Sequence, residues 1–231
     1  MGQLWDKLTV SEAAVVACVS VRDVNRLYDE KVLPEDLLLR SYVRHDHDRF
    51  VVTWACALIA FYFESAARLT TDERLKAITN AAPRVNEVFN DVIPIWETNL
   101  HQIQRLELKD LKFKDSFLTI DWEPTVSKVA HRLHRLSCAK RMVETSPDVL
   151  SGTPVIAGTR VPVYDVAASV EKGISIDRIL DAYPSLNREQ IELAAFYAKA
   201  VPSRGRPRKR ELPKGATIIA DRRIPRRKAS K

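Results

Sequence analysis

The spacing of hydrophobic and polar positions near the start of the chain predicts two short helices joined by a brief turn. Thr9 and Glu12 match a capping box, in which a hydroxyl and a carboxylate satisfy free amides at a helix start, and small apolar residues follow them up to Ala17. Ser20 is a second N-cap signal, and Pro34 ends the element that it opens. The apolar positions of this second helix recur at helical spacing: Val21, Val24, Leu27 and Tyr28.

Two extended runs after these helices predict a hairpin, or wing. Residues 37–42 and 49–53 flank a polar tip. Two helices followed by a wing resemble the MerR-type winged helix-turn-helix over residues 8–50, although short capped helix pairs also occur in proteins that never touch DNA. In a unit of this kind the second helix lies in the major groove, where Arg pairs with guanine and Asn with adenine. The expected DNA contacts are Ser20, Arg22, Asn25, Arg26, Arg44 and Arg49.

The pattern in the middle of the chain predicts helices that carry no candidate catalytic or binding residues. Val51–Leu69 is apolar nearly all round, which is typical of a helix covered on every side. Thr71 opens a further helix, and Pro83 interrupts that helix. Residues 117–121 alternate like a strand, and Pro124 then starts a helix with one apolar stripe. We expect this region to connect two domains or to form a dimer.

Residues 141–201 predict a small domain that begins with two short extended runs. Gly158 lies between the runs Pro154–Ile156 and Val161–Val163, where glycine permits a tight turn because it tolerates positive φ. Ser175 and Asn187 are natural N-caps for the second and third of three helices. The predicted helices cover residues 164–171, 175–181 and 188–199. Their predicted core is Val166, Val170, Ile174, Ile176, Ile179, Leu180, Ile191, Ala194, Ala195 and Tyr197.

The start of this domain carries the sharpest sequence signal, a G-x-P-V-x-x-G-T-R-x-P-V run over residues 152–163. The run resembles the domain of unknown function 433, although Ser151 stands where that family often has glycine. The resemblance implies a homeodomain-like trihelical fold and an antitoxin role. Longer members with an N-terminal helix-turn-helix resemble VapB-type antitoxins, which pair with PIN-like ribonuclease toxins. Structural roles are expected for Gly152, Pro154, Gly158, Thr159, Arg160 and Pro162, with Arg160 bound to backbone carbonyls or to an acid.

The positive charge of the chain is concentrated at its C-terminal end. The formal net charge is +7, yet residues 201–231 hold 12 Lys or Arg against two acids, so the rest of the chain is slightly acidic. Such a block attracts polyanions, either nucleic acid or an acidic pocket on a partner. Its Arg-Gly-Arg-Pro sequence is the core of an AT-hook, in which two arginines follow the floor of a narrow minor groove. These minor-groove contacts would come from Arg204, Gly205, Arg206 and Pro207.

Apolar residues beside the later arginines favour a second partner for the tail. A purely electrostatic tail has no need of isoleucines, whereas apolar anchors suit a segment that orders on a protein. Because PIN-like toxins hold a divalent metal in a cluster of carboxylates, the family resemblance implies that Arg222 or Arg223 fills that acidic site. The expected toxin-binding residues are Ile218, Ile219, Arg222, Arg223 and Ile224.

Several classes of function find no support in the sequence. No apolar run is long enough to span a bilayer, no export signal is present, and three scattered cysteines suit a reducing bacterial cytoplasm. We find no phosphate-binding loop, metal-ligand spacing or nucleophile elbow, so we expect no enzyme, metal site or cofactor. The leading hypothesis is a dimeric antitoxin that binds a PIN-like toxin and double-stranded operator DNA. The alternative is a stand-alone transcriptional regulator or nucleoid protein.

The expected fold class is therefore mainly α with small β elements. We expect a winged helix-turn-helix over residues 1–69 and a helical connecting region over 70–140. A homeodomain-like trihelical domain over 141–201 and a basic tail over 202–231 complete the expected order.

Overall fold

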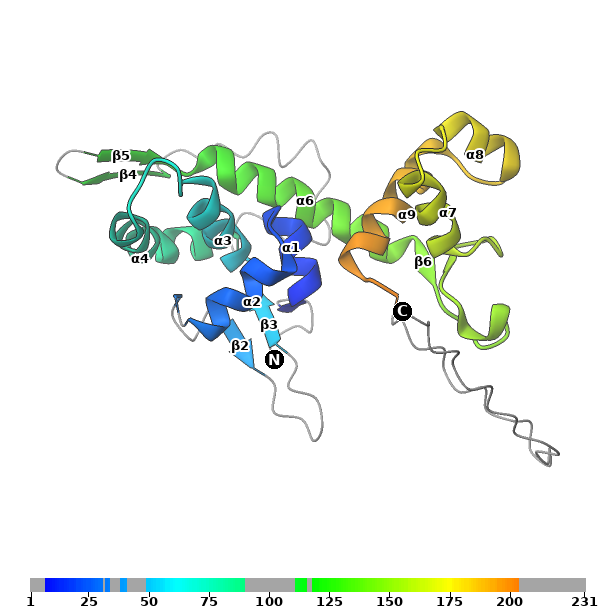
Figure 1. The fold of residues 1–231 in the computed structure, drawn as a ribbon, viewed down its shortest axis with the longest axis horizontal. Helices are drawn as coiled ribbons and strands as arrows, with labels where there is room; N and C mark the ends of the chain where they lie inside the picture. The colour runs from blue at the N-terminus through cyan, green and yellow to red at the C-terminus, as the bar shows by residue number, and fades with distance from the viewer. Residues whose placement is uncertain are drawn as a thin grey trace, which may run out of the picture.

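The computed structural model describes residues 7–30, 32–33, 38–40, 49–89, 111–115 and 118–203 of the chain. These residues form a mainly helical fold with small antiparallel strands, which confirms the predicted fold class. The long helix α6 (Glu123–Arg141) runs through the middle of the molecule (Figure 1). Helices α3 and α4 lie toward one end of α6, α1 lies beside its middle, and α7 to α9 lie at the other end (Figure 1).

The first predicted helix pair is present, and both helices begin at the predicted caps. The Thr9 hydroxyl accepts from the Glu12 amide while the Glu12 carboxylate accepts from the Thr9 amide, and Ser20 and Asp23 repeat the arrangement. Cys18 adopts a left-handed conformation (φ 59°) at the C-cap of the first helix and turns the chain toward the second. The helices are α1 (Val10–Ala17) and α2 (Val21–Asp29).

A three-stranded antiparallel sheet packs beside these helices. The predicted hairpin strands pair with each other, with Leu39 opposite Phe50, and the tip between them lies outside the described residues. A third strand, in which Leu8 pairs with Val51, does not follow from the sequence pattern, because three residues are too few to show a period. The strands are β1 (Lys7–Thr9), β2 (Leu38–Arg40) and β3 (Arg49–Val52), in the order β1-β3-β2.

The long apolar helix predicted over Val51–Leu69 is wrong at both ends. Val51 and Val52 belong to β3, where β-branched side chains suit a pleated surface, and the helix α3 covers only Ala55–Glu64. The prediction that this helix is covered on every side is confirmed, because all residues from Ala55 to Tyr62 are buried. Its end packs on α6, where the rings of Phe61 and Trp122 have centroids 4.1 Å apart.

The next helix, α4 (Thr71–Glu87), runs through Pro83, so the interruption predicted there is wrong. Pro83 lies on the exposed face, and a proline at that position loses one backbone hydrogen bond. The opposite face of α4 is buried through Ala77, Ile78, Ala81 and Val85. Tertiary packing therefore outweighs the local cost of the proline.

The strand predicted over residues 117–121 is confirmed as β5 (Leu118–Asp121), which pairs with β4 (Lys112–Asp115). The helix predicted at Pro124 is confirmed as α6, which buries its apolar stripe in the core formed with α1, α3 and α4.

The C-terminal unit contains the three predicted helices, each within one residue of its predicted bounds. The extended runs form only a small sheet, in which Val155 and Ile156 pair with Val143 and Glu144 and Val155 also bridges to Pro162. Ile174, predicted in the core, is 39% exposed because it lies in the turn between two helices. The elements are β6 (Val143–Glu144), η2 (Leu150–Gly152), β7 (Val155–Ile156), α7 (Val163–Glu171), α8 (Ile176–Ala182) and α9 (Arg188–Ala200).

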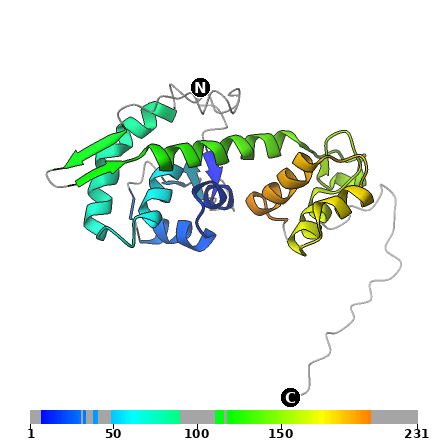
Figure 2. The ribbon, with the colours of Figure 1, turned by 90° about the horizontal axis from the view of Figure 1, so that it is seen from above.

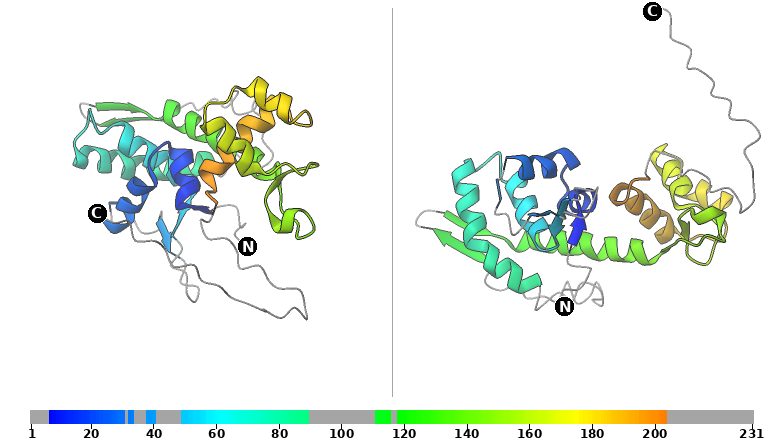
Figure 3. Two further views of the ribbon diagram at one scale, coloured as in Figure 1. Left: turned by 45° about the vertical axis from the view of Figure 1, so that its right-hand side comes forward. Right: turned by 90° about the horizontal axis from the view of Figure 1, so that it is seen from below.

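Helix α9 belongs to two hydrophobic cores. Ile191 and Ala194 are buried against α7 and α8, within the C-terminal unit. Phe196 and Ala200 pack instead into the core formed by the N-terminal elements. Figures 2 and 3 show α9 between α7 and the second half of α6. The two units are therefore packed together through one shared helix.

Candidate nucleic-acid interface

Helix α2 has one buried and one outward-facing side. Val24, Leu27 and Tyr28 are almost fully buried, which fixes the helix on the sheet and on α1. The opposite side carries the residues that the sequence analysis assigned to DNA. Arg22 and Arg26 are exposed there, and Asn25 is half-buried.

Arg49, at the start of β3, holds the base of the hairpin against α2. Its guanidinium donates to Asn25 Oδ1 at 3.0 Å and pairs with Asp29 Oδ1 at 2.6 Å. It also lies over the Tyr28 ring, 5.2 Å from the centroid, and the Tyr28 hydroxyl donates to the Phe50 carbonyl. Two predicted DNA contacts, Asn25 and Arg49, thus bond to each other across the unit.

Ser20 and Arg26 also have intramolecular partners. The Ser20 hydroxyl donates to Asp23 Oδ2 at 2.6 Å and accepts from the Asp23 amide, so it acts as an N-cap. This hydroxyl, helped by the Ser20 amide and by nearby arginines, lowers the pKa of Asp23. Arg26 pairs loosely with Glu30 at 3.8 Å and lies over the Phe63 ring. Arg22 forms no ion pair with any residue that the structure describes.

The remaining predicted contacts lie outside the described residues. They are Arg44 at the wing tip, Arg204, Gly205, Arg206 and Pro207 in the AT-hook sequence, and Ile218, Ile219, Arg222, Arg223 and Ile224 further on. The described chain ends just after α9, at Ser203. There the Tyr164 hydroxyl donates to the Val201 carbonyl at 2.9 Å, and burial raises the pKa of Tyr164.

The G-x-P-V-x-x-G-T-R-x-P-V run forms a tight turn that leads into α7. Gly158 has φ +72°, a left-handed conformation that strains other residues. The Thr159 hydroxyl closes the turn by donating to the Ile156 carbonyl at 2.7 Å and accepting from the Val161 amide at 3.1 Å. The Pro154 carbonyl accepts from the Val163 amide at 3.0 Å, and Pro162 is the N-cap of α7.

Two features of this region differ from the expectation. Arg160 is exposed, and neither the carbonyl nor the acid expected for it lies in contact with it among the described residues. Leu150 and Ser151 precede Gly152 in left-handed conformations, with φ 45° and 55°, although neither is a glycine. The segment leading into the motif is therefore strained.

Helix α9, the third helix of the C-terminal unit, keeps one exposed stripe that includes Arg188, Glu192 and Lys199. Its two sides are taken by α7 and by α6 with α1. Contacts to α6 include an ion pair between Arg135 and Glu192 at 3.9 Å and the Arg135 guanidinium over the Phe196 ring. The exposed stripe of α9 carries both acids and bases, and Glu192 and Arg188 are paired with Arg135 and Asp177, so this stripe is poorly suited to binding phosphates.

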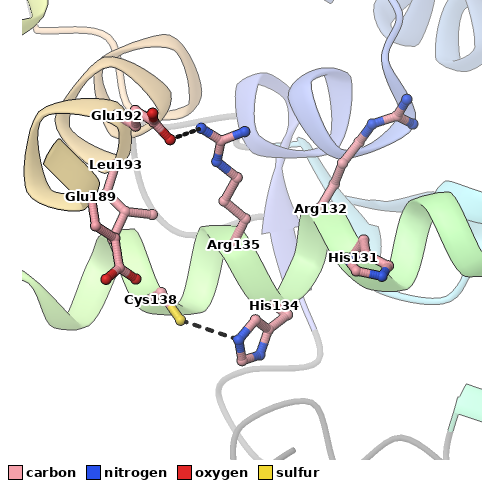
Figure 4. Close-up of a pocket in the computed structure, with 8 residues that line it drawn as sticks. All are labelled: His131, Arg132, His134, Arg135, Cys138, Glu189, Glu192 and Leu193. Atoms are coloured by element: carbon pink, nitrogen blue, oxygen red, sulfur yellow. Dashed lines mark hydrogen bonds and ion pairs between the residues drawn. The ribbon is translucent and has the colours of Figure 1, made fainter. Parts of the chain in front are cut away.

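An open pocket of about 320 Å³ lies where the start of α9 meets α6 (Figure 4). His134 Nε2 lies 3.4 Å from Cys138 Sγ in its wall, and burial lowers the pKa of His134, with smaller effects from Arg141 and His131. Glu189 and Glu192 line the side opposite α6 (Figure 4). No three His, Cys, Asp or Glu side chains of the described chain are placed to hold a metal ion.

One ion pair between α1 and α6 could not be found from the sequence. Glu12 Oε1 pairs with Lys140 Nζ at 2.7 Å while its other oxygen caps α1, and the Glu12 side chain is only 8% exposed. The capping box predicts the second role, but nothing local predicts a partner so far along the chain.

Within the described ranges, no helix is both long and apolar enough to cross a membrane.

Comparison with known proteins identifies a family match that covers most of the C-terminal unit described above. Residues 143–198 match the family described as "Protein of unknown function (DUF433)", so the chain carries a DUF433 domain, as its sequence motif predicts. The chain belongs to the same family as uncharacterized protein y4eO of Sinorhizobium fredii. The two are 49% identical over 229 residues, which cover 99% of this chain and 97% of that protein.

One similar solved structure is the crystal structure of Rv2018 from Mycobacterium tuberculosis. It matches with a TM-score of 0.35 and 17% sequence identity, over 81% of this chain and 96% of that one. A likeness of this size is too low to establish a common fold.

Proposed function

We propose that the chain is a cytoplasmic antitoxin that binds its own operator DNA and inhibits a PIN-like ribonuclease toxin. The observation that carries the DNA part is the outward side of α2, where Arg22 lies exposed on a helix whose second half Arg49 holds against the base of the hairpin. In a winged helix-turn-helix this side of the second helix faces the base edges. The hairpin would contact the adjoining phosphates.

The packing of α9 supports different roles for the N-terminal unit and the DUF433 unit. The DUF433 unit also has three helices, but its third helix packs on α6 and α7 and exposes a stripe of mixed charge. We therefore assign groove reading to α2 and a scaffold role to the DUF433 unit. A homodimer with two α2 helices one helical turn apart would bind a palindromic operator.

The toxin part of the proposal rests on the tail and on the resemblance to VapB-type antitoxins. Residues 201–231 carry 12 bases against two acids, and isoleucines accompany the later arginines. An arginine placed among the metal-binding carboxylates of a PIN-like toxin would displace the metal or block the substrate. Arg222 and Arg223 lie beside the apolar anchors and are the side chains proposed for this role.

Co-expression with a PIN-like nuclease from an adjacent gene, identified by sequencing the locus, tests the toxin part. The full chain should restore growth, and a chain truncated after Arg210 should not. A matched pair of full-length variants sharpens the test, because R222A/R223A and R226A/R227A remove equal charge. Only the first pair should release the toxin. Neutralisation by the truncated chain would exclude the tail as the inhibitory segment.

A stand-alone regulator or nucleoid protein is the second candidate, because the α2 face and the AT-hook sequence both favour DNA and neither requires a toxin. DNA binding cannot separate the two candidates. If purified chain captures no product of an adjacent gene while binding duplex DNA tightly, the regulator is favoured.

A further inference from the structure

The first turn of α2 carries an apolar side chain that the fold does not bury. The helical spacing predicts that Val21 joins Val24, Leu27 and Tyr28 in the core, but Val21 is 45% exposed while the other three are almost fully buried. Val21 follows the N-cap Ser20 and therefore belongs to the turn that a recognition helix presents first to the bases.

Beyond the first turn of α2, the side chains that point outward are less free to read bases. Asn25 needs its carbonyl oxygen to recognise adenine, but that oxygen accepts from Arg49. Arg26 lies between Glu30 and the Phe63 ring. Val21 and Arg22 are thus the exposed, uncommitted pair at the start of the helix.

These two side chains complement particular base edges in the major groove. The C5 methyl of thymine is the apolar group that bases present there, and aliphatic side chains contact it. An arginine recognises guanine by donating to both O6 and N7. A valine beside an arginine therefore fits a thymine next to a guanine.

We propose that Val21 contacts a thymine methyl group and that Arg22 contacts a neighbouring guanine in each half-site of the bound DNA. This assignment rests on the proposed DNA-binding function and adds the base sequence that α2 reads. It also moves specificity away from Asn25, which the sequence pattern alone favours for adenine.

The test begins with duplexes selected from a randomised pool by the full-length chain. In the selected duplex, each thymine is replaced in turn by deoxyuridine, which lacks only the methyl group. At one position per half-site the wild type should lose about fourfold in affinity, the effect expected for one buried methyl group. V21A should bind the thymine and deoxyuridine duplexes equally, while V21T, which keeps a methyl group, should retain part of the preference.

The arginine is tested in the same way with 7-deazaguanine, which lacks the N7 acceptor. The wild type should lose at least about fivefold at one guanine adjacent to the sensitive thymine, and R22Q should show no such loss. Matched controls come from the DUF433 unit, where I174A trims a similarly exposed apolar residue and R178Q removes an exposed arginine. Both controls should keep the wild-type preferences.

The outcomes separate this inference from the proposed function. Selection of tight duplexes whose binding ignores every deoxyuridine replacement would overturn the role of Val21 and leave DNA binding standing. A chain that selects no duplex at all would contradict both the base assignment and the proposed DNA binding. Because Val21 and Arg22 lie on the surface, the variants should unfold at the same temperature as the wild type. A thermal unfolding measurement therefore checks that each variant is folded.

Discussion

At the scale of single residues, the interface is defined as much by internal bonds as by exposed groups. Arg49 illustrates this, because its planar guanidinium reaches Asn25, Asp29 and the Tyr28 ring at once. A residue of this kind sets the angle between the hairpin and α2. Its contribution to DNA binding would then be largely one of geometry, in contrast to that of Arg22.

Replacing Arg49 by lysine tests this role. Lysine keeps the charge but cannot bond Asn25 and Asp29 in the same fork, so the free energy of unfolding should fall by about 1 kcal/mol. Urea unfolding followed by tryptophan fluorescence measures the change. The control R68K alters an exposed arginine and should have almost no effect. Equal effects of the two substitutions would refute the proposed role of Arg49.

At the scale of elements, α6 connects the two units. It packs against α1, α3 and α9. A different basic residue of α6 forms an ion pair with a glutamate on each of these three helices. The ion pairs differ in burial. Lys140 meets the buried Glu12, whereas Lys128 meets Glu64 with both side chains about half exposed.

This contrast predicts unequal costs for two similar substitutions. K140M keeps most of the aliphatic stem but leaves the Glu12 carboxylate buried without its cation, so the free energy of unfolding should fall by about 2 kcal/mol. K128M removes an exposed pair and should cost less than about 0.5 kcal/mol. Chemical denaturation of both variants gives the comparison. A K128M effect as large as that of K140M would show that burial does not decide the strength of these pairs.

The pocket between α6 and α9 predicts a dependence of stability on pH. Because burial lowers the pKa of His134 below its usual 6.5 in the folded chain, the unfolded chain takes up the proton more readily. The stability that the neutral His134 imidazole gives to the folded chain is therefore fully present above about pH 6.5. This stability is lost as the pH falls below that value. Glu189 and Glu192 line the same pocket.

H134Q tests this dependence. Wild type and variant should be compared by urea unfolding at about pH 7.5 and about pH 5.5, above the range in which most carboxylates titrate. The wild type should lose more stability than H134Q between the two values. An identical decline in both proteins would assign the pH dependence to other groups.

At the scale of the whole molecule, charge is divided between a compact body and a tail. Removing residues 202–231 should flatten the salt dependence of DNA binding by about 0.9 in the log–log slope for each phosphate that the tail no longer neutralises. Truncation after Arg210 keeps the AT-hook sequence and should flatten the slope less. Fluorescence anisotropy at several salt concentrations measures both. An unchanged slope would place the phosphate contacts on the body of the molecule.

Local signals predicted much of this fold, and longer-range pairings did not follow from them. Capping boxes at Thr9, Ser20 and Asn187 fixed three helix starts, because a cap is a contact within four residues. Strands β1 and β6 were missed, since two or three residues show no period and their partners lie far away. The exposure of Val21 and the bonds of Arg49 likewise depend on tertiary packing.

The end of the shared helix α9 limits the reach of the tail. Tyr164 fixes the carbonyl of Val201, and the six residues from there to Pro207 span at most about 20 Å when fully extended. The Arg-Gly-Arg-Pro sequence can therefore reach only about six base pairs of duplex in either direction from its anchor. An operator for this protein should hold its A·T-rich tract at a nearly constant offset from the bases under α2, and inserting half a helical turn between them should disable one contact or the other.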